Sequence, residues 1–268
     1  MDKFIELRGR EAGKTSVILA GVHGNETCGV EAFKKILPKL QIERGRVFFG
    51  YGNPEAILKK VRQTESNLNR MFKEHENITA TERKSYEYKR ARFLKRYLDR
   101  ADALLDIHAS GNPNSRKFII CEKNAFKITK YLPFALLVSG FDKVEPGGTD
   151  YYMNRHGKIG ICVECGYLRD PATAEVAEKS IMTFLKTRGH IPGKKKVRGQ
   201  SKINMYSLYL SKTDDFKLSR PFADFEKVSA GEVIGTDGKE KICSPKDGVI
   251  LFARNAKRAG TESFLLGK

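Results

Sequence analysis

The chain lacks several features that would place it in a specialised class of protein. Its 268 residues contain no apolar run approaching the ~20 residues of a membrane span, and its first residues lack the apolar region of a signal peptide. There is also no internal repeat and no low-complexity tract. The sequence therefore predicts a globular protein that resides in the cytoplasm and has no membrane partner.

Cysteine is too sparse and too scattered for a disulfide framework. The five cysteines are an odd number and lie far apart along the chain. Cys162 and Cys165 form a Cys-x-x-Cys pair, but a strand would place them on opposite faces, unlike the turn-to-helix setting of redox motifs. A reducing compartment is consistent with this pattern, and no redox or metal role is expected for the pair.

Acidic residues are few relative to basic ones. The chain has 32 aspartates and glutamates and 50 lysines and arginines, so its formal net charge is +18. Such a charge attracts nucleic acids nonspecifically, and it would equally steer acidic acyl amino acids into a cleft. The basic residues are dispersed apart from a cluster at 194–198, and no nucleic-acid-binding motif accompanies them. A basic nucleic-acid-associated protein remains the alternative of another class, and a steep loss of affinity with salt would distinguish it.

Histidine is also rare, with five in the chain, but one of them, His23, lies between an expected strand and an expected helix. The apolar run at 16–20 reads as a buried strand and residues 27–37 as a helix, so His23 and Glu26 lie in the turn between them. Glycines in this turn permit a tight backbone path. An imidazole and a carboxylate three positions apart can then converge on one ion.

Two further strands bring polar side chains to the same edge of a sheet. Residues 103–108 form an apolar run, and alternation along a strand puts Asp106 and His108 on one face. A carboxylate beside a metal-bound histidine usually orients the ring, so Asp106 is expected to support His108. The apolar run at 159–163 delivers Glu164. Sites in open α/β sheets form outside the carboxyl ends of the strands, where these side chains would meet.

Together these residues match the donor set of a catalytic zinc site. Such sites take three protein ligands, typically two histidines and a carboxylate, and leave a fourth position for water. His23, Glu26 and His108 could supply this set for one Zn²⁺ per chain. A single His-x-x-Glu arises often by chance, but the expected convergence of three strand ends favours a metal site. The remaining histidines lack such a setting and are expected on the surface. They are His75, His156 and His190.

The motifs of the chain also resemble those of a known family. They are Gly-Val-His-Gly-Asn-Glu from residue 21, Asn-Pro from 53, Arg62, Asn-Leu-Asn-Arg-Met-Phe from 67, Asp-Ile-His from 106 and Val-Glu-Cys-Gly from 163. In this order and combination they resemble the succinylglutamate desuccinylase and aspartoacylase family, a branch of the zinc carboxypeptidase-like fold. The resemblance implies an α/β fold in which helices flank a mixed sheet.

The resemblance also implies a role for each motif residue. The two histidines and Glu26 would bind zinc, and Glu164 would be the general base that activates water and then protonates the leaving amine. Arg62 would polarise the scissile carbonyl and stabilise the oxyanion. Asn69 and Arg70 would hold a substrate carboxylate. Without the motif, Arg62 and Arg70 would read as part of a solvated helix face.

One departure from the family lies beside the first candidate ligand. Asn67 stands where the family usually has an aspartate, which is expected to accept the second ring proton of the first zinc histidine. Asn67 can accept that hydrogen bond but supplies no negative charge. His23 should therefore be a less basic ligand, and metal affinity could be lower unless Asp106 or another acid compensates.

A second departure concerns the substrate. The segment before Glu164 has no clear match to the family's additional substrate arginine. Tyr151 and Arg155, in a glycine-rich segment at 147–155, are the candidates for this role. An ordinary surface loop is the alternative.

A change of pattern near residue 190 marks a second domain. The helix expected at 171–188 is followed by glycine, proline and a run of lysines, and then by short period-two runs separated by glycines. We expect a zinc carboxypeptidase-like catalytic domain at 1–192 and a small β-barrel-like domain at 193–268 that caps the cleft. Residues 244–250 resemble the turn of a biotinyl or lipoyl carrier barrel, but Lys246 lacks the usual neighbouring methionine. The small β domain is therefore expected to be structural or to form a lid over the cleft, and not to act as a carrier.

These observations predict a zinc-dependent hydrolase that cleaves the amide bond of an N-acyl amino acid or a related small amide. A metallocarboxypeptidase and a peptide amidase are the alternatives that keep the metal. The short separations between the motifs and the β appendage favour the deacylase. Activity on N-acyl amino acids, compared with peptides that have a free C-terminal carboxylate, would separate these functions.

Overall fold

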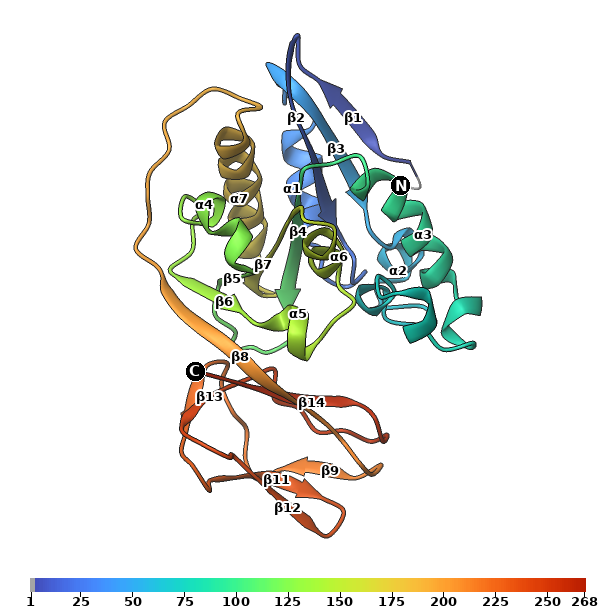
Figure 1. Ribbon diagram of the computed structural model, residues 1–268, viewed down its shortest axis with the longest axis vertical. Coiled ribbons are helices and arrows are strands. Elements are labelled where there is room, and N and C mark those ends of the chain that lie inside the picture. The colour runs from blue at the N-terminus through green and yellow to red at the C-terminus, as the bar shows by residue number, and fades with distance from the viewer. Residues whose placement is uncertain (1–2) are drawn as a thin grey trace.

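The computed structural model describes residues 3–268 and consists of an α/β part followed by a smaller β part (Figure 1). The α/β part is built on a mixed sheet with helices on both faces. The β part lies at one end of it and contains the C-terminus. The expected fold class, a mixed α/β sheet with a small β appendage, is confirmed.

Most strands belong to one continuous sheet of eleven strands. In spatial order they are β1 (Ile5–Arg8), β3 (Arg44–Tyr51), β2 (Glu11–Ala20), β4 (Ala103–Ser110), β7 (Ile159–Tyr167), β5 (Phe118–Cys121), β6 (Leu136–Ser139), β8 (Ser201–Leu210), β14 (Glu262–Gly267), β13 (Gly248–Leu251) and β10 (Glu226–Val228). A second sheet has three strands in the order β12 (Glu240–Cys243), β11 (Val233–Asp237) and β9 (Phe216–Leu218).

The helices are confined to the α/β part. They are α1 (Cys28–Ile36), α2 (Pro54–Lys59), α3 (Tyr86–Leu98), α4 (Phe126–Thr129), α5 (Phe141–Val144), α6 (Thr149–Arg155) and α7 (Ala172–Arg188), with short 3₁₀ turns at Leu68–Arg70, His75–Asn77, Glu82–Lys84 and Lys123–Ala125. None of the helices within residues 3–268 is long and apolar enough to cross a membrane. The helices expected at 27–37 and 171–188 correspond to α1 and α7.

The centre of the large sheet is parallel. Strand β2 pairs in parallel with β3 and β4, and β4 pairs in parallel with β7. The carboxyl ends of these strands therefore lie at one edge, which is where an open α/β sheet forms its site. Strands β1 and β5 run antiparallel to β3 and β7, so the sheet is mixed.

Alternation along the buried strands builds two core layers, one on each face of the sheet. In β2, Ile18 and Ala20 pack in the layer that contains α1 and α7, whereas Val17 and Leu19 pack in the layer that contains α3 and α6. A fully buried side chain of this size contributes about 1.5–3 kcal/mol relative to an exposed one. These two layers hold the strand ends in a fixed relation to one another.

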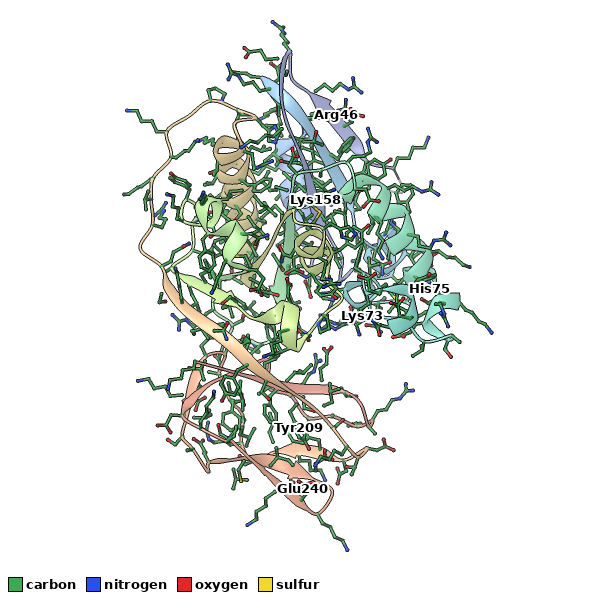
Figure 2. The ribbon with its side chains drawn as sticks, in the orientation of Figure 1. Arg46, Lys73, His75, Lys158, Tyr209 and Glu240 are labelled. Atoms are coloured by element: carbon green, nitrogen blue, oxygen red, sulfur yellow. The ribbon has the colours of Figure 1, made fainter. Side chains whose placement is uncertain are left out.

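One alternative and one expectation from the sequence differ from the structure. The glycine-rich segment at 147–155 is not a surface loop, because helix α6 begins directly after Gly148. His190 is buried, with 1% of its surface exposed, whereas His75 and His156 are exposed as expected (Figure 2 labels His75). After α7 the chain turns back onto the sheet, and the His190 ring lies 2.8 Å from the Ser16 Oγ. The partner is remote in sequence, so the local pattern does not reveal this burial.

The β part continues the large sheet without a break. Strand β8 pairs with β6 of the α/β part and with β14 of the β part. The strands β8, β14, β13 and β10 then face the three-stranded sheet, and apolar side chains from both sheets form a common core. This core contains Phe216, Ile234, Ile242, Ile250 and Phe264. The exposed connection between α7 and β8 contains the expected boundary at 192/193.

Candidate active site

Three candidate ligands converge at the carboxyl ends of β2 and β4. The His23 Nδ1 lies 2.8 Å from Glu26 Oε1, and the His108 Nδ1 lies 2.9 Å from Glu26 Oε2. One ligand atom from each residue lies within 4.8 Å of the others. All three residues are buried. The structure therefore brings together the donor set expected from the sequence.

The turn after β2 requires glycine at two positions. Gly21 has a φ of +66°, in the left-handed region where side chains are strained. At Gly24, a Cβ would lie 2.1 Å from the backbone carbon of Ala56, so no side chain fits. The glycines thus allow the chain to reverse tightly and place His23 and Glu26 on the same side of the turn.

The second ring nitrogen of each histidine faces an oxygen. Asn67 Oδ1 accepts from the backbone N–H of Asn69 and lies 3.1 Å from the His23 Nε2, so its oxygen faces that ring. Asp106 Oδ2 lies 3.2 Å from the His108 Nε2 and also accepts from the Thr149 hydroxyl. With a proton on its Nε2, His23 turns its Nδ1 lone pair to Glu26, whereas the His108 Nε2 lies at ion-pair distance from Asp106 and makes no hydrogen bond within residues 3–268.

The electrostatics of this cluster favour positive charge beside Glu26. Burial lowers the pKa of His23 to about 4, so its ring is neutral. Burial opposes ionisation of Glu26, yet His23 and His108 hold the pKa of Glu26 well below its usual value. For His108, burial opposes protonation, but Cys162 and Asp106 hold the pKa well above its usual value. The Glu26 carboxylate is thus balanced by Arg62, whose Nη1 lies 3.0 Å from its Oε1, together with positive charge on or between the imidazoles.

The residues present fit a zinc ion. Two imidazole nitrogens and a carboxylate are the donors of catalytic zinc sites, and orientation of each ring by an oxygen on its far nitrogen is typical of such sites. The Nδ1 lone pairs facing Glu26 would repel its oxygens unless a proton or a cation lies between them. A divalent cation satisfies all three groups at once.

Glu164 lies on the strand beside the candidate ligands. In the register of β4 and β7 it is directly opposite His108. Its side chain is buried, and its Oε2 has no hydrogen-bond partner among residues 3–268. Burial, and after it the charge of Glu26, raises the pKa of Glu164 to about 8. A carboxyl group with a raised pKa beside three candidate metal ligands is suited to exchanging protons with a reactant.

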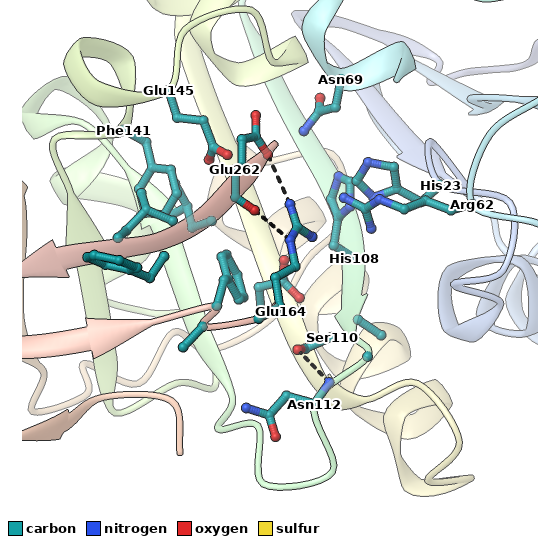
Figure 3. Close-up of a pocket in the computed structure, with 18 of the residues that line it drawn as sticks. His23, Arg62, Asn69, His108, Ser110, Asn112, Phe141, Glu145, Glu164 and Glu262 are labelled. Atoms are coloured by element: carbon teal, nitrogen blue, oxygen red, sulfur yellow. Dashed lines mark hydrogen bonds and ion pairs between the residues drawn. The ribbon is translucent and has the colours of Figure 1, made fainter. Parts of the chain in front are cut away.

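Arg62 reaches the same cluster from the segment after α2. Its Nη1 donates to Glu26 Oε1 at 3.0 Å, and its side chain is 42% exposed. The guanidinium therefore retains N–H groups that can contact a bound molecule. Arg62 and His23 lie on the same side of the pocket in Figure 3.

These groups open into one large pocket, with a volume of about 770 Å³, at the junction of the two parts of the molecule (Figure 3). The α/β part supplies the candidate ligands, Glu164, Arg62, Asn69 and Arg70. The β part supplies a second wall, which includes Leu218, Arg220, Phe222, Phe252, Arg254 and Glu262. The candidate site is therefore a cleft that the β part partly encloses.

Not all of the expected substrate-binding residues line the pocket. Asn69 and Tyr151 line the pocket. Arg155 does not, because the pocket reaches only the first turn of α6 and Arg155 is the last residue of that helix. Its side chain is 59% exposed, and its Nη2 lies 3.9 Å from a Glu74 carboxylate oxygen. The structure thus gives no support for Arg155 as a substrate residue.

Arg70 lines the pocket but is not free. Its Nε donates to Glu262 at 2.7 Å, its Nη2 pairs with Glu145, and its Nη1 donates to the Asn69 carbonyl oxygen at 2.8 Å. Neither Glu145 nor Glu262 was among the site residues expected from the sequence. No motif surrounds them, and Glu262 lies 192 positions from Arg70, so only the fold brings them together.

Comparison with known proteins places this geometry in a family. The family model of the succinylglutamate desuccinylase/aspartoacylase catalytic domain matches the sequence over residues 12–190. A succinylglutamate desuccinylase of Shewanella baltica is 28% identical over 264 residues, which cover 86% of this chain and 75% of the relative.

Solved structures show the same fold over nearly the whole chain. The succinylglutamate desuccinylase of Vibrio cholerae has a TM-score of 0.83 at 18% identity and covers 99% of this chain and 85% of its own. A succinylglutamate desuccinylase/aspartoacylase of Rhodobacter sphaeroides has a TM-score of 0.73 at 19% identity, covering 99% of this chain and 88% of its own. The chain belongs to the succinylglutamate desuccinylase/aspartoacylase family of deacylases.

Proposed function

We propose that this protein is a zinc-dependent amidohydrolase that removes an acyl group from an amino acid or a related small amine. The single observation that carries the proposal is the convergence of His23, Glu26 and His108, with Glu164 opposite His108 on the neighbouring strand. The first three residues would hold one Zn²⁺. Membership of a deacylase family supports the reaction type.

Each residue of the site has a distinct part in the proposed reaction. Zinc, when bound, supplies Lewis-acid polarisation of the scissile carbonyl and lowers the pKa of water to about 7. Glu164 takes the proton of the attacking water and delivers it to the leaving amine nitrogen. Arg62 donates from its free N–H groups to the carbonyl oxygen as negative charge develops there. Asn69 and Tyr151 contact the remainder of the substrate.

The β part is proposed to restrict the substrate to small molecules. It contributes a full wall of the pocket, from Leu218 to Phe222 and from Phe252 to Asn255. A long peptide would have to pass this wall to reach the metal cluster. This arrangement favours a deacylase over a metallocarboxypeptidase or a peptide amidase.

Elemental analysis and a substrate panel test the proposal together. The purified protein should contain close to one zinc per chain and should hydrolyse N-acyl amino acids or acyl amines faster than peptides with a free C-terminal carboxylate. Preferential cleavage of such peptides would replace the deacylase with a carboxypeptidase. Absence of zinc after incubation with the metal would overturn the proposal altogether.

A further prediction concerns Asn67. An aspartate at this position would give the His23 Nε2 a charged acceptor in place of the amide oxygen at 3.1 Å, which would make the ring a more basic ligand. Asn67→Asp is therefore expected to tighten zinc binding about tenfold, the lower end of the effect of such supporting groups. Competition with a chelator of known affinity measures the change.

The matched control is Asn77→Asp, which adds the same charge at an exposed position. It should leave zinc affinity within about twofold of the wild type, because solvent screens a distant surface charge. An equal gain in both variants would mean that net charge, and not the hydrogen bond to His23, governs the affinity.

A further inference from the structure

Arg70 is held in a network of acids on one wall of the active-site pocket. The side chains of Arg70, Glu145 and Glu262 are 16%, 10% and 22% exposed, respectively, so all three are largely removed from solvent. Glu262 also lies 3.4 Å from the Arg254 Nη2. Figure 3 shows Glu145 and Glu262 near each other on the wall away from His23 and Arg62.

The pairing gives each nitrogen of the Arg70 guanidinium an acceptor from the protein. A carboxylate binds arginine best through two parallel N–H groups, either Nε with Nη2 or Nη1 with Nη2. The Nε is taken by Glu262, the Nη2 by Glu145 and the Nη1 by the Asn69 carbonyl oxygen. Three of the five guanidinium N–H groups are thus engaged, and a substrate carboxylate that approaches Arg70 must compete with two protein carboxylates for its charge.

The same wall carries further acids. Asp142 and Asp150 also line the pocket, and no lysine or arginine within residues 3–268 forms an ion pair with either. Burial, with the mutual repulsion of neighbouring acids, raises the pKa of Asp142 to about 7. This raised pKa means that the wall disfavours additional negative charge, such as that of a substrate carboxylate, although the chain as a whole has a formal net charge of +18.

We propose that Glu145 and Glu262 determine substrate specificity by occupying Arg70, so that the enzyme acts on acyl amines that present a neutral or cationic group, and not a carboxylate, to this wall. The inference rests on the proposed deacylase function and narrows its substrate class. Mono-acylated diamines and the amides of acyl amino acids belong to this class. N-acyl dicarboxylic amino acids do not.

The first test needs only the wild-type, zinc-loaded protein. N-succinylalanine has one carboxylate on the acyl half and one on the amine half, and each can be converted separately to a carboxamide. We expect kcat/KM to be at least tenfold higher for one of the two monoamides than for the diacid, because one carboxylate no longer meets the acidic wall. The preferred monoamide identifies the half that faces Arg70. N-acetyl-1,4-diaminobutane should also be a substrate.

Isosteric variants then test the two acids directly. Glu145→Gln and Glu262→Gln keep the shape of each side chain but release Arg70 for an external anion. In either variant the ratio of kcat/KM for the diacid to that for the preferred monoamide should rise at least tenfold. The matched control is Glu232→Gln, which removes a carboxylate paired with another pocket arginine, Arg220, but does not touch Arg70. Its ratio should remain that of the wild type.

The possible outcomes separate the inference from the proposed function. Faster hydrolysis of the diacid than of both monoamides by the wild type would overturn the inference and leave the deacylase intact. An unchanged ratio in both glutamine variants would likewise remove Glu145 and Glu262 as specificity residues. If the zinc-loaded protein hydrolyses none of these compounds, the deacylase proposal fails and the inference fails with it.

Discussion

Replacement of Glu164 by glutamine is expected to lower kcat/KM for the best acyl amine on the order of 10³-fold, since a positioned general base contributes roughly 10²–10⁴. Glutamine preserves the shape of the side chain but cannot take up a proton. Glu164 faces His108 across two paired strands and is not one of the three candidate ligands, so zinc content should stay at the wild-type level. Steady-state kinetics and elemental analysis on the same preparation measure both quantities.

A nearby buried acid provides the control for this variant. Asp224 is 4% exposed and, like Glu164, has one oxygen without a partner among the described residues, but it has no proposed role in proton transfer. Asp224→Asn should retain activity within about tenfold of the wild type. Retention of more than a tenth of the activity by Glu164→Gln would show that another group moves the proton.

Replacement of His108 by alanine is expected to abolish both zinc binding and activity. The change removes one of three candidate ligands, and even supporting groups around a metal are worth 10–100-fold in affinity. We therefore expect zinc affinity to fall by more than about 10²-fold, with no metal retained through gel filtration. Elemental analysis of the eluted protein, with an assay at saturating zinc, measures the loss.

The control for His108→Ala is His156→Ala, because His156 is exposed and remote from the ligand cluster. That variant should keep the zinc content and kcat/KM of the wild type. Thermal unfolding of both variants distinguishes loss of the metal from loss of the fold. A folded His108→Ala protein that still carries stoichiometric zinc would refute the ligand assignment.

The geometry expected from the sequence agrees with the structure where the residues concerned lie in one short segment or motif. His23 and Glu26 lie in one turn, and Asp106 and His108 lie on one strand face, so period and spacing alone indicated that each pair shares a direction. Asn67 was expected to face His23, and its Oδ1 lies 3.1 Å from the ring. These relations depend on local backbone geometry or on a motif, and both can be read along the chain.

Prediction was less successful where a contact joins remote segments. His190 was expected on the surface but lies against Ser16, 174 positions away. Arg155 was expected in a binding loop, yet the segment is helix α6 and the helix carries Arg155 away from the pocket. In both cases the packing of one element on another decides the outcome, and hydrophobic periodicity carries no information about it.

The sequence by itself indicated the fold class and the candidate metal ligands, and its resemblance to the family indicated the proposed general base, because strand ends, glycine turns and motif order are local properties. Only the tertiary structure decided the state of Arg70. Glu145 follows α5 in the α/β part, whereas Glu262 begins β14 and reaches Arg70 because β14 pairs with β8, the strand that joins the β part to the rest of the large sheet. Whether a guanidinium is free to bind a substrate depends on which charges surround it in space. Residues distant in sequence supply those charges here, so the proposed ligands can be located from short segments, whereas the proposed specificity depends on the whole fold.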